Sequence, residues 1–232
     1  MADVTIRASD GGRFSAYLAT PKSGSGPGIL VIQEIFGVNA VMRRTADDFA
    51  ARGYTAICPD LFWRQEPGIQ ITDKTEAEWK RAFELYQGFD LAKGVEDLKA
   101  TLAALRKHPA CTGKAGTVGY CLGGRLAYEM ATRSDADCNV GYYGVGIQDA
   151  LDEARNITKP LLLHIAEKDQ FVPPEAQEKV KNALKGMPQV TIHSYPNADH
   201  AFARIDGQTF NKEAAELANR RTAEFFHRHL GG

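Results

Sequence analysis

The hydrophobic positions of the chain fall into short apolar runs separated by longer amphipathic stretches. Apolar runs rich in Val and Ile are typical of buried parallel strands, and stretches of helical period are typical of covering helices. The alternation predicts an α/β fold with an open, mostly parallel sheet flanked by helices. We expect strands near residues 14–19, 28–34, 54–58, 114–120, 138–144, 160–166 and 189–195. We expect helices near 39–52, 76–107, 122–133, 173–185 and 208–229, the first two capped by Asn39 and Thr75.

Two stretches between these elements have the composition of loops. Residues 23–28, SGSGPG, predict a turn before the first central strand, because the segment is too short to separate two cores. Residues 60–75 contain turn formers without apolar periodicity and predict a long surface loop of the kind that forms ligand sites. A chain of this length can bury a large core, so we predict a single domain over residues 1–232.

Composition and charge exclude several function classes. Hydrophobic residues make up 44% and charged residues 25%, as in ordinary globular proteins, and the formal net charge is −1. Without a long basic run we expect no nucleic-acid partner. Without a signal-like segment or a spanning apolar window we expect no membrane association and a cytoplasmic location. We also expect a monomer.

The four cysteines lack the spacing of disulfide or zinc motifs, so neither a disulfide framework nor a metal site is expected. Cys58, Cys111 and Cys138 are interpreted as small buried hydrophobic residues. Cys121 differs because it lies in Gly119-Tyr120-Cys121-Leu122-Gly123-Gly124, between an apolar run and a helix.

This segment matches the nucleophile elbow of α/β-hydrolases, G-x-S-x-G, with Cys in place of Ser. Glycines suit the sharp turn from strand to helix, where the backbone segments come too close for side chains. The turn is expected to expose the thiol above the sheet, where the N-terminus of the helix favours a thiolate. A glycine-rich turn around an inert cysteine is the alternative interpretation.

An acid and a histidine follow in the order that this fold requires. Asp169 follows the predicted strand at 160–166, and His200 follows the one at 189–195. Asp199 is a rival acid, but adjacent side chains rarely orient each other, so Asp169 is preferred. The remaining histidines, within strands or near helix ends, are interpreted as structural: His108, His164, His193, His227 and His229.

The oxyanion of a tetrahedral intermediate needs two backbone N–H donors. In this fold one comes from the residue after the nucleophile and the other from a loop after an early strand. These positions are Leu122 and Ile35, next to Glu34 at the end of an apolar run. Taken alone, Glu34 could equally be a solvated strand end.

The chain resembles the dienelactone hydrolases, or carboxymethylenebutenolidases, over nearly its whole length. The motifs with this resemblance are residues 33–37 (QEIFG), 58–61 (CPDL), 119–124 (GYCLGG), 141–146 (GYYGVG), 169–173 (DQFVP) and 200–204 (HAFAR). The resemblance implies that Cys121, Asp169 and His200 form a catalytic triad.

The resemblance also implies roles around the triad. Glu34 would contact the resting thiol and help to form the thiolate, and Arg204 would bind the substrate carboxylate. Phe36 and Phe83 are further substrate-binding candidates, although the family has a tyrosine where Phe83 stands. A second basic contact would come from Arg81 or Lys80, or be missing, which leaves the substrate open.

We therefore predict a cofactor-free carboxylic ester hydrolase that opens a small, carboxylate-bearing enol-lactone such as dienelactone through a thioester. One alternative is a cysteine esterase with another substrate range on the same scaffold. Another is a non-catalytic small-molecule binder or thiol sensor.

Overall fold

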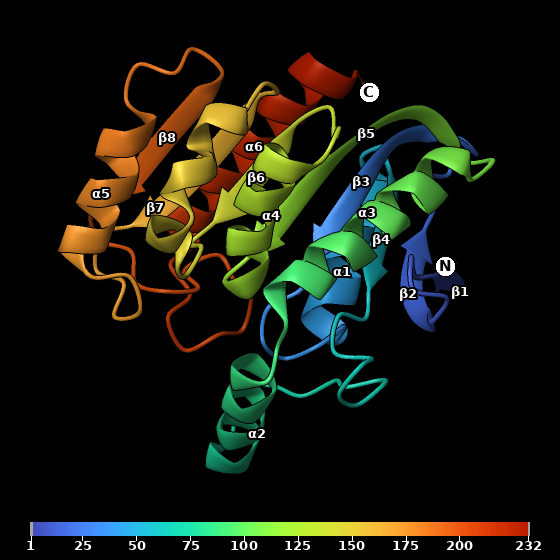
Figure 1. The fold of residues 1–232 in the computed structure, drawn as a ribbon, viewed down its shortest axis with the longest axis horizontal. Helices are drawn as coiled ribbons and strands as arrows, with labels where there is room; N and C mark the ends of the chain where they lie inside the picture. The colour runs from blue at the N-terminus through green and yellow to red at the C-terminus, as the bar shows by residue number, and fades with distance from the viewer. Residues whose placement is uncertain (1, 232) are drawn as a thin grey trace. The chain divides into compact units, whose positions relative to one another are not determined.

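A computed structural model describes residues 2–231, which divide into two compact units, residues 2–117 and 118–231. The boundary falls within strand β5 (Cys111–Tyr120), so each unit contains part of that strand. The prediction of one domain over residues 1–232 stays a prediction. The two units are described in turn (Figure 1).

The first unit contains a sheet with the strand order β1-β2-β4-β3-β5. Its other strands are β1 (Ala2–Arg7), β2 (Arg13–Ala19), β3 (Gly26–Ile32) and β4 (Thr55–Pro59). Strand β2 pairs antiparallel with β1 and β4, whereas β3 and β4 are parallel. Helices α1 (Ala40–Ala51) and α3 (Leu91–Lys107) both pack on β3 and β4, and α2 (Glu76–Gln87) projects away from these strands in Figure 1.

The predicted helix caps are confirmed in this unit. The Asn39 side chain accepts hydrogen bonds from the backbone N–H groups of Val41 and Met42, and the Thr75 hydroxyl accepts one from Glu78. Such caps satisfy N–H groups that have no acceptor within the helix. The sequence therefore located the starts of α1 and α2.

The prediction of one helix over residues 76–107 is wrong. Helix α2 ends at Gln87 with Gly88 as its C-cap, and α3 begins at Leu91. Asp90 caps α3 by accepting a hydrogen bond from the Lys93 N–H. A glycine followed closely by an acidic N-cap is a stop and a start signal, and it outweighs the continuous apolar periodicity.

Strand β1 was absent from the sequence prediction. Ile6 is its only buried residue, because the strand lies at the edge of the sheet. Half-buried edge strands lack the continuous apolar run by which buried strands are recognised. Residues 60–75 form the predicted loop, although Leu61 and Phe62 are buried within it.

The second unit has the strand order β5-β6-β7-β8, with β6, β7 and β8 parallel. Its strands after β5 are β6 (Asn139–Tyr142), β7 (Leu161–Ala166) and β8 (Val190–Tyr195). Its helices are α4 (Leu122–Arg133), α5 (Pro174–Leu184) and α6 (Lys212–Leu230), with 3₁₀ turns η1 (Ile147–Asp149) and η2 (Leu151–Asn156). Apolar side chains of β7, α4 and α5 form a core cluster that includes Leu161, Tyr128 and Val180.

A buried polar network joins β7 to α6 in this unit. The His164 ring makes hydrogen bonds with the Tyr195 hydroxyl (2.8 Å) and the Thr222 hydroxyl (2.9 Å). Thr222 also bonds with the Tyr142 hydroxyl at 2.6 Å. Buried polar groups are stable when they are paired, so His164 has the structural role expected from its place in a strand.

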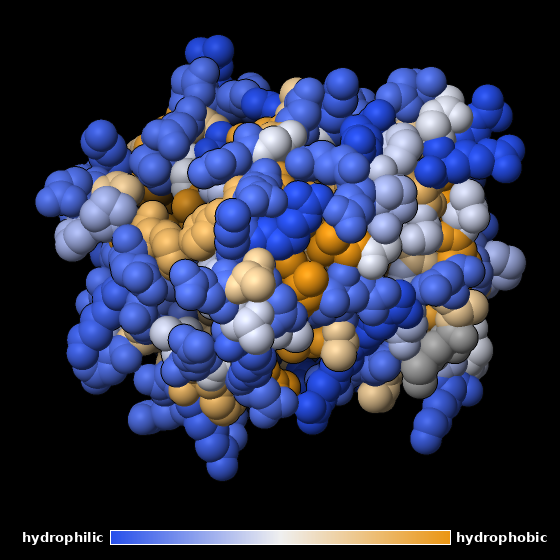
Figure 2. All heavy atoms as spheres, turned by 90° about the horizontal axis from the view of Figure 1, so that it is seen from below, coloured by the Kyte–Doolittle hydropathy of each residue, from blue (hydrophilic) through white to orange (hydrophobic). Residues whose placement is uncertain are grey.

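None of the helices in residues 2–231 is long and apolar enough to cross a bilayer. Figure 2 shows a face covered mainly by hydrophilic residues, with smaller hydrophobic patches among them. Over the described chain, Phe83, Phe171 and Phe210 are the large hydrophobic residues that are most exposed.

Candidate active site

Cys121 lies at the turn between β5 and α4, where it is the N-cap residue of the helix. Its backbone has φ 56° and ψ −115°, in a region that residues with a side chain rarely adopt. Such strain is stored at functional sites when the surrounding structure imposes it. The predicted elbow geometry is therefore present.

The glycines of the elbow are required by close backbone contacts. A Cβ atom on Gly119 would lie 1.8 Å from the Gly123 carbonyl oxygen, and one on Gly124 would lie 2.3 Å from the Tyr142 carbonyl oxygen. These contacts involve backbone, which cannot move aside as a flexible side chain can. The sequence argument from steric crowding is thus confirmed at Gly119.

The expectation of an exposed thiol is wrong, because Cys121 is only 6% exposed. Its backbone N–H donates to the Tyr142 carbonyl oxygen at 3.1 Å, and its side chain is hydrogen-bonded with His200. The elbow therefore places the thiol in a buried setting beside His200.

Asp169 and His200 meet in a short hydrogen bond between carboxylate Oδ2 and ring Nδ1, at 2.8 Å. Both residues are at least 95% buried. The other oxygen of Asp169 accepts from the Phe171 N–H at 2.9 Å, which orients the carboxylate. Asp199, the rival acid, instead accepts a hydrogen bond from the backbone N–H of His200.

The environment of His200 raises its pKa to about 10. Burial is the largest single influence and by itself favours the neutral imidazole. It is outweighed by the negative charge of Cys121 and by the hydrogen bonds with Asp169 and Cys121, which favour the imidazolium. The three side chains therefore form a continuous chain of contacts, in which the neighbours of His200 favour the charged form of its ring.

Two aromatic side chains that sequence reasoning did not single out pack against His200. Tyr143 and Phe171 both meet the imidazole edge-on, at centroid distances of 5.2 and 4.8 Å. Tyr143 is buried and has a strained φ of 37°, whereas Phe171 is 36% exposed. Both lie within motifs already recognised, 141–146 and 169–173, which was the signal that could have identified them.

Arg204 lies on the loop that follows His200 and is 7% exposed. Its backbone N–H donates to the Ala201 carbonyl oxygen at 2.9 Å, in a tight turn where Ala201 has φ 61°. A buried guanidinium needs charged or polar partners, which makes Arg204 more than a solvated surface residue. Its predicted binding of a substrate carboxylate stays a prediction.

Five further predicted site residues lie in the first unit, and three of them follow β3. Glu34, Ile35 and Phe36 are all buried, at 2%, 5% and 1% exposed. The neighbouring Gln33 side chain accepts from the Leu61 N–H and donates to the Glu34 carbonyl oxygen, so it fixes the backbone of this segment. Glu34 is therefore not the solvated strand end that its position alone allowed.

Helix α2 presents the remaining two candidates. Phe83 is 38% exposed and stacks on Trp79, whose ring also meets Phe36 edge-on. Arg81 is ion-paired with Glu66 and, at 3.0 Å, with Glu84. These carboxylates compete with any substrate carboxylate for the Arg81 guanidinium, so its predicted role is the least supported by the contacts.

Comparisons with known proteins agree with this geometry. Residues 14–230 match the model of the dienelactone hydrolase family. A protein of Azospirillum brasilense, provisionally named a carboxymethylenebutenolidase, is 58% identical, with full coverage of both chains. The carboxymethylenebutenolidase of Pseudomonas sp. (strain P51) is 42% identical over 97% of this chain and 94% of its own.

A solved structure supports the fold independently. The provisionally assigned dienelactone hydrolase of Klebsiella pneumoniae has a TM-score of 0.86 and 27% identity, covering 98% of each chain. The predicted α/β-hydrolase fold, with a mostly parallel sheet flanked by helices, is confirmed, as is the prediction of a hydrolytic enzyme. The chain belongs to the dienelactone hydrolase family.

Proposed function

We propose that this hydrolase opens a small enol-lactone, such as dienelactone to maleylacetate, through a thioester on Cys121. The observation that supports it best is the chain of contacts from Asp169 through His200 to Cys121. Once formed, a thiolate paired with an imidazolium is a strong enough nucleophile to attack a lactone carbonyl at neutral pH. The names of the relatives supply the substrate class.

In the acylation step, the Cys121 sulfur attacks the lactone carbonyl carbon. The developing oxyanion would be held by the backbone N–H groups of Leu122, at the start of α4, and of Ile35. When the tetrahedral intermediate collapses, the ring C–O bond breaks. Because the leaving group of an enol-lactone is a resonance-stabilised enolate, it departs without strong protonation.

The deacylation step uses the change in charge on sulfur. A thioester is neutral, so acylation removes the negative charge that helps to raise the pKa of His200. The imidazolium then loses its proton more readily, to the enolate product or to water. Neutral His200, oriented by Asp169, takes a proton from water as its oxygen attacks the thioester, and the C–S bond breaks to restore the thiolate.

Substrate recognition is the finer part of the proposal. Arg204 would pair with a substrate carboxylate, Phe36 and Phe83 would contact its apolar part, and Arg81 would provide a second basic contact. Glu34 would contact the resting thiol and aid thiolate formation when substrate displaces it. We further propose that the enzyme acts as a cytoplasmic monomer.

A cysteine esterase with another substrate range is the second candidate. Two observations favour it: Phe83 stands where the family has a tyrosine, and Arg81 is engaged by Glu66 and Glu84. Both reduce the polar contacts available to an anionic lactone. A thiol sensor without turnover is the third candidate, and the contact between Asp169 and His200 argues against it, because a sensor does not need an oriented base.

The test is a substrate panel with and without thiol alkylation. Purified protein is assayed on dienelactone, p-nitrophenyl acetate and a small thioester, before and after iodoacetamide. The proposal expects dienelactone to give the highest kcat/KM and alkylation to abolish all turnover. Preference for the neutral ester would indicate the esterase. A protein that turns over no member of the panel, although iodoacetamide alkylates its thiol, would indicate the sensor.

A further inference from the structure

The loop that carries Asp169 is fixed on one side by the segment that leads to His200. This acid loop, residues 167–172, is most of the segment that joins β7 to α5. The Glu167 N–H donates to the Tyr195 carbonyl oxygen at 3.1 Å, and the Lys168 N–H donates to the Ala198 carbonyl oxygen at 2.9 Å. These two hydrogen bonds attach the start of the acid loop to the strand and turn that precede His200.

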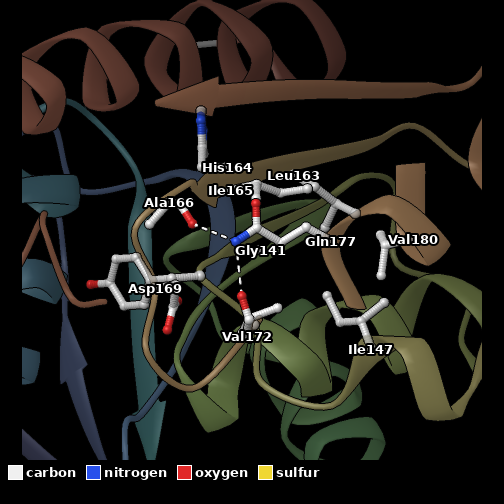
Figure 3. A pocket seen from close by; sticks show the side chains of 12 residues that line it. Gly141, Ile147, Leu163, His164, Ile165, Ala166, Asp169, Val172, Gln177 and Val180 are labelled. Atoms are coloured by element: carbon white, nitrogen blue, oxygen red, sulfur yellow. Dashed lines mark hydrogen bonds between the residues drawn. The ribbon is translucent and has the colours of Figure 1, made fainter. Parts of the chain in front are cut away.

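Gln177 of α5 holds the opposite side of the loop. Its side-chain amide donates to the Ala166 carbonyl oxygen at 3.1 Å and to the Val172 carbonyl oxygen at 2.8 Å (Figure 3). A longer contact of 3.4 Å reaches the Glu167 carbonyl oxygen. Ala166 precedes the loop and Val172 ends it, so one side chain joins its two ends.

A small cavity lies beside the acid loop. It lies against Asp169, Val172 and Gln177 and has a volume of about 20 Å³, large enough for about one water molecule. Gln177 is only 3% exposed, so its amide has little access to bulk water. Atoms do not fill this gap, so the hydrogen bonds of Gln177 are what join the two ends of the loop beside it.

We propose that Gln177 is a positioning residue that closes the acid loop and so sets the contact of Asp169 with His200. This inference rests on the proposed function, because it assigns Gln177 to the triad through Asp169. Without the amide, the two carbonyl oxygens each lose a buried donor, and the loop shifts to compensate. The 2.8 Å contact between Asp169 and His200 is then lengthened.

The first test replaces Gln177 with Met, which has similar length but no donor. The Gln177→Met variant should lower kcat on the best panel substrate about 10- to 100-fold, as small displacements of catalytic groups do, while KM changes little. Gln189→Met is the matched control, because Gln189 also donates to a backbone carbonyl, that of Ile157, but away from the acid loop. An equal loss of kcat in both variants would assign Gln177 a general structural role.

The second test asks whether Gln177 acts through Asp169. In an Asp169→Asn background the contact is already impaired, so adding Gln177→Met should lower kcat by no more than about twofold, because coupled sites are not additive. A further loss as large as in the parent enzyme would overturn the proposal.

The third test needs no turnover and so separates this inference from the proposed function. The Nδ1–H of His200, bonded to Asp169, should give a low-field proton resonance, assigned by its loss in His200→Gln. Gln177→Met should weaken or shift it, and Gln189→Met should leave it in place. If Cys121→Ala stayed active, the proposed function would fail while this measurement still decided the role of Gln177.

A second variant covers the case in which Gln177→Met does not fold. Gln177→Glu keeps the side-chain length, but its ionised carboxylate has no donor for the two carbonyl oxygens. We expect it to lose the resonance and to lower kcat as pH rises and the carboxyl ionises. A resonance and a kcat that match the parent at every pH would contradict the proposal.

Discussion

His200 and His164 are both nearly fully buried in the second unit, at 4% and 1% exposed, yet their pKa values move in opposite directions. The pKa of His200 is raised to about 10, whereas that of His164 lies well below 6.5. Burial lowers the pKa in both cases, because it disfavours the charged ring. The neighbours differ: His200 faces Asp169 and Cys121, and His164 faces the hydroxyls of Tyr195 and Thr222.

The charges around His164 reinforce the effect of burial. After burial, the positive charges of His193 and Arg221 lower its pKa further. A neutral imidazole suits a structural role, since it can donate one hydrogen bond and accept another without a desolvated charge. Burial therefore does not decide what a histidine does in this protein, and the charge of its hydrogen-bond partners does.

The largest expected effect comes from removing the Cys121 sulfur, which is hydrogen-bonded with His200. Cys121→Ala should lower kcat by at least about 10⁴-fold, as the loss of a nucleophile does in other triad hydrolases. It should also lower the pKa of His200 below about 10, because a favourable negative charge is lost. Activity assays and an NMR titration measure the two effects. Activity within tenfold of the parent would refute the nucleophile, and an unchanged pKa would refute the ion pair.

Removing the carboxylate should have the next largest effect. Asp169→Asn should lower kcat about 10²- to 10⁴-fold, because the imidazole loses the group that orients it and stabilises its charge. Asp199→Asn is the matched control, since Asp199 bonds with the His200 backbone and not with its ring. Steady-state kinetics on both variants decide the matter: if the control were as damaged, the choice of acid would be wrong.

Arg221 and Arg204 have different surroundings and different expected roles. Arg221 lies over Tyr195 and acts on His164, whereas Arg204 is proposed to face substrate. A charge-assisted hydrogen bond contributes about 1.5–3 kcal/mol, so Arg204→Ala should lower kcat/KM for a carboxylate-bearing lactone about 10- to 150-fold. Hydrolysis of p-nitrophenyl acetate should change little. Equal losses on both substrates would indicate a structural role, and no loss on the lactone would remove Arg204 from carboxylate recognition.

The smallest effect concerns stability at the structural histidine. Because the folded pKa of His164 lies below its unfolded value, the unfolded chain binds a proton that the folded chain refuses. The resulting stability is greatest above about pH 6.5 and falls as pH decreases below it. Below about pH 6.5, the free energy of unfolding of the parent, measured in urea, should therefore fall by up to about 1.4 kcal/mol per pH unit more than that of His164→Gln.

The control for this prediction keeps the imidazole and removes a partner. Tyr195→Phe should lower the free energy of unfolding at every pH by about 0.5–1.5 kcal/mol for each of the two hydrogen bonds that its hydroxyl makes, with His164 and with Arg221. Its dependence on pH should match the parent. If His164→Gln kept the parent's slope, the titrating group would lie elsewhere.

Local sequence signals predicted the elements that depend on local physics. The caps at Asn39 and Thr75 do not depend on tertiary contacts, because each side chain bonds with N–H groups only two or three residues away. The glycine at 119 is needed because the backbone returns on itself within five residues. The division of residues 76–107 was not predicted, although Gly88 and Asp90 are the local stop and start signals of the two helices.

Environments formed by distant segments were not predicted. The burial of Cys121, the aromatic edges of Tyr143 and Phe171 around His200, and the bridge made by Gln177 all depend on loops far apart in sequence. In the sequence Gln177 is an ordinary polar residue of an amphipathic helix. Only the path of the acid loop places two backbone carbonyl oxygens within its reach.

By itself, the sequence determined the fold class and the family, and it supplied the proposed order of nucleophile, acid and base, because the motifs that carry them lie at strand ends. The tertiary structure decided which histidine is poised to carry charge. His164 and His200 are the same residue type with similar burial, so nothing local distinguishes their pKa values. The difference comes from the charges that folding brings within hydrogen-bond distance of each ring, across separations of 31 residues or more in the chain.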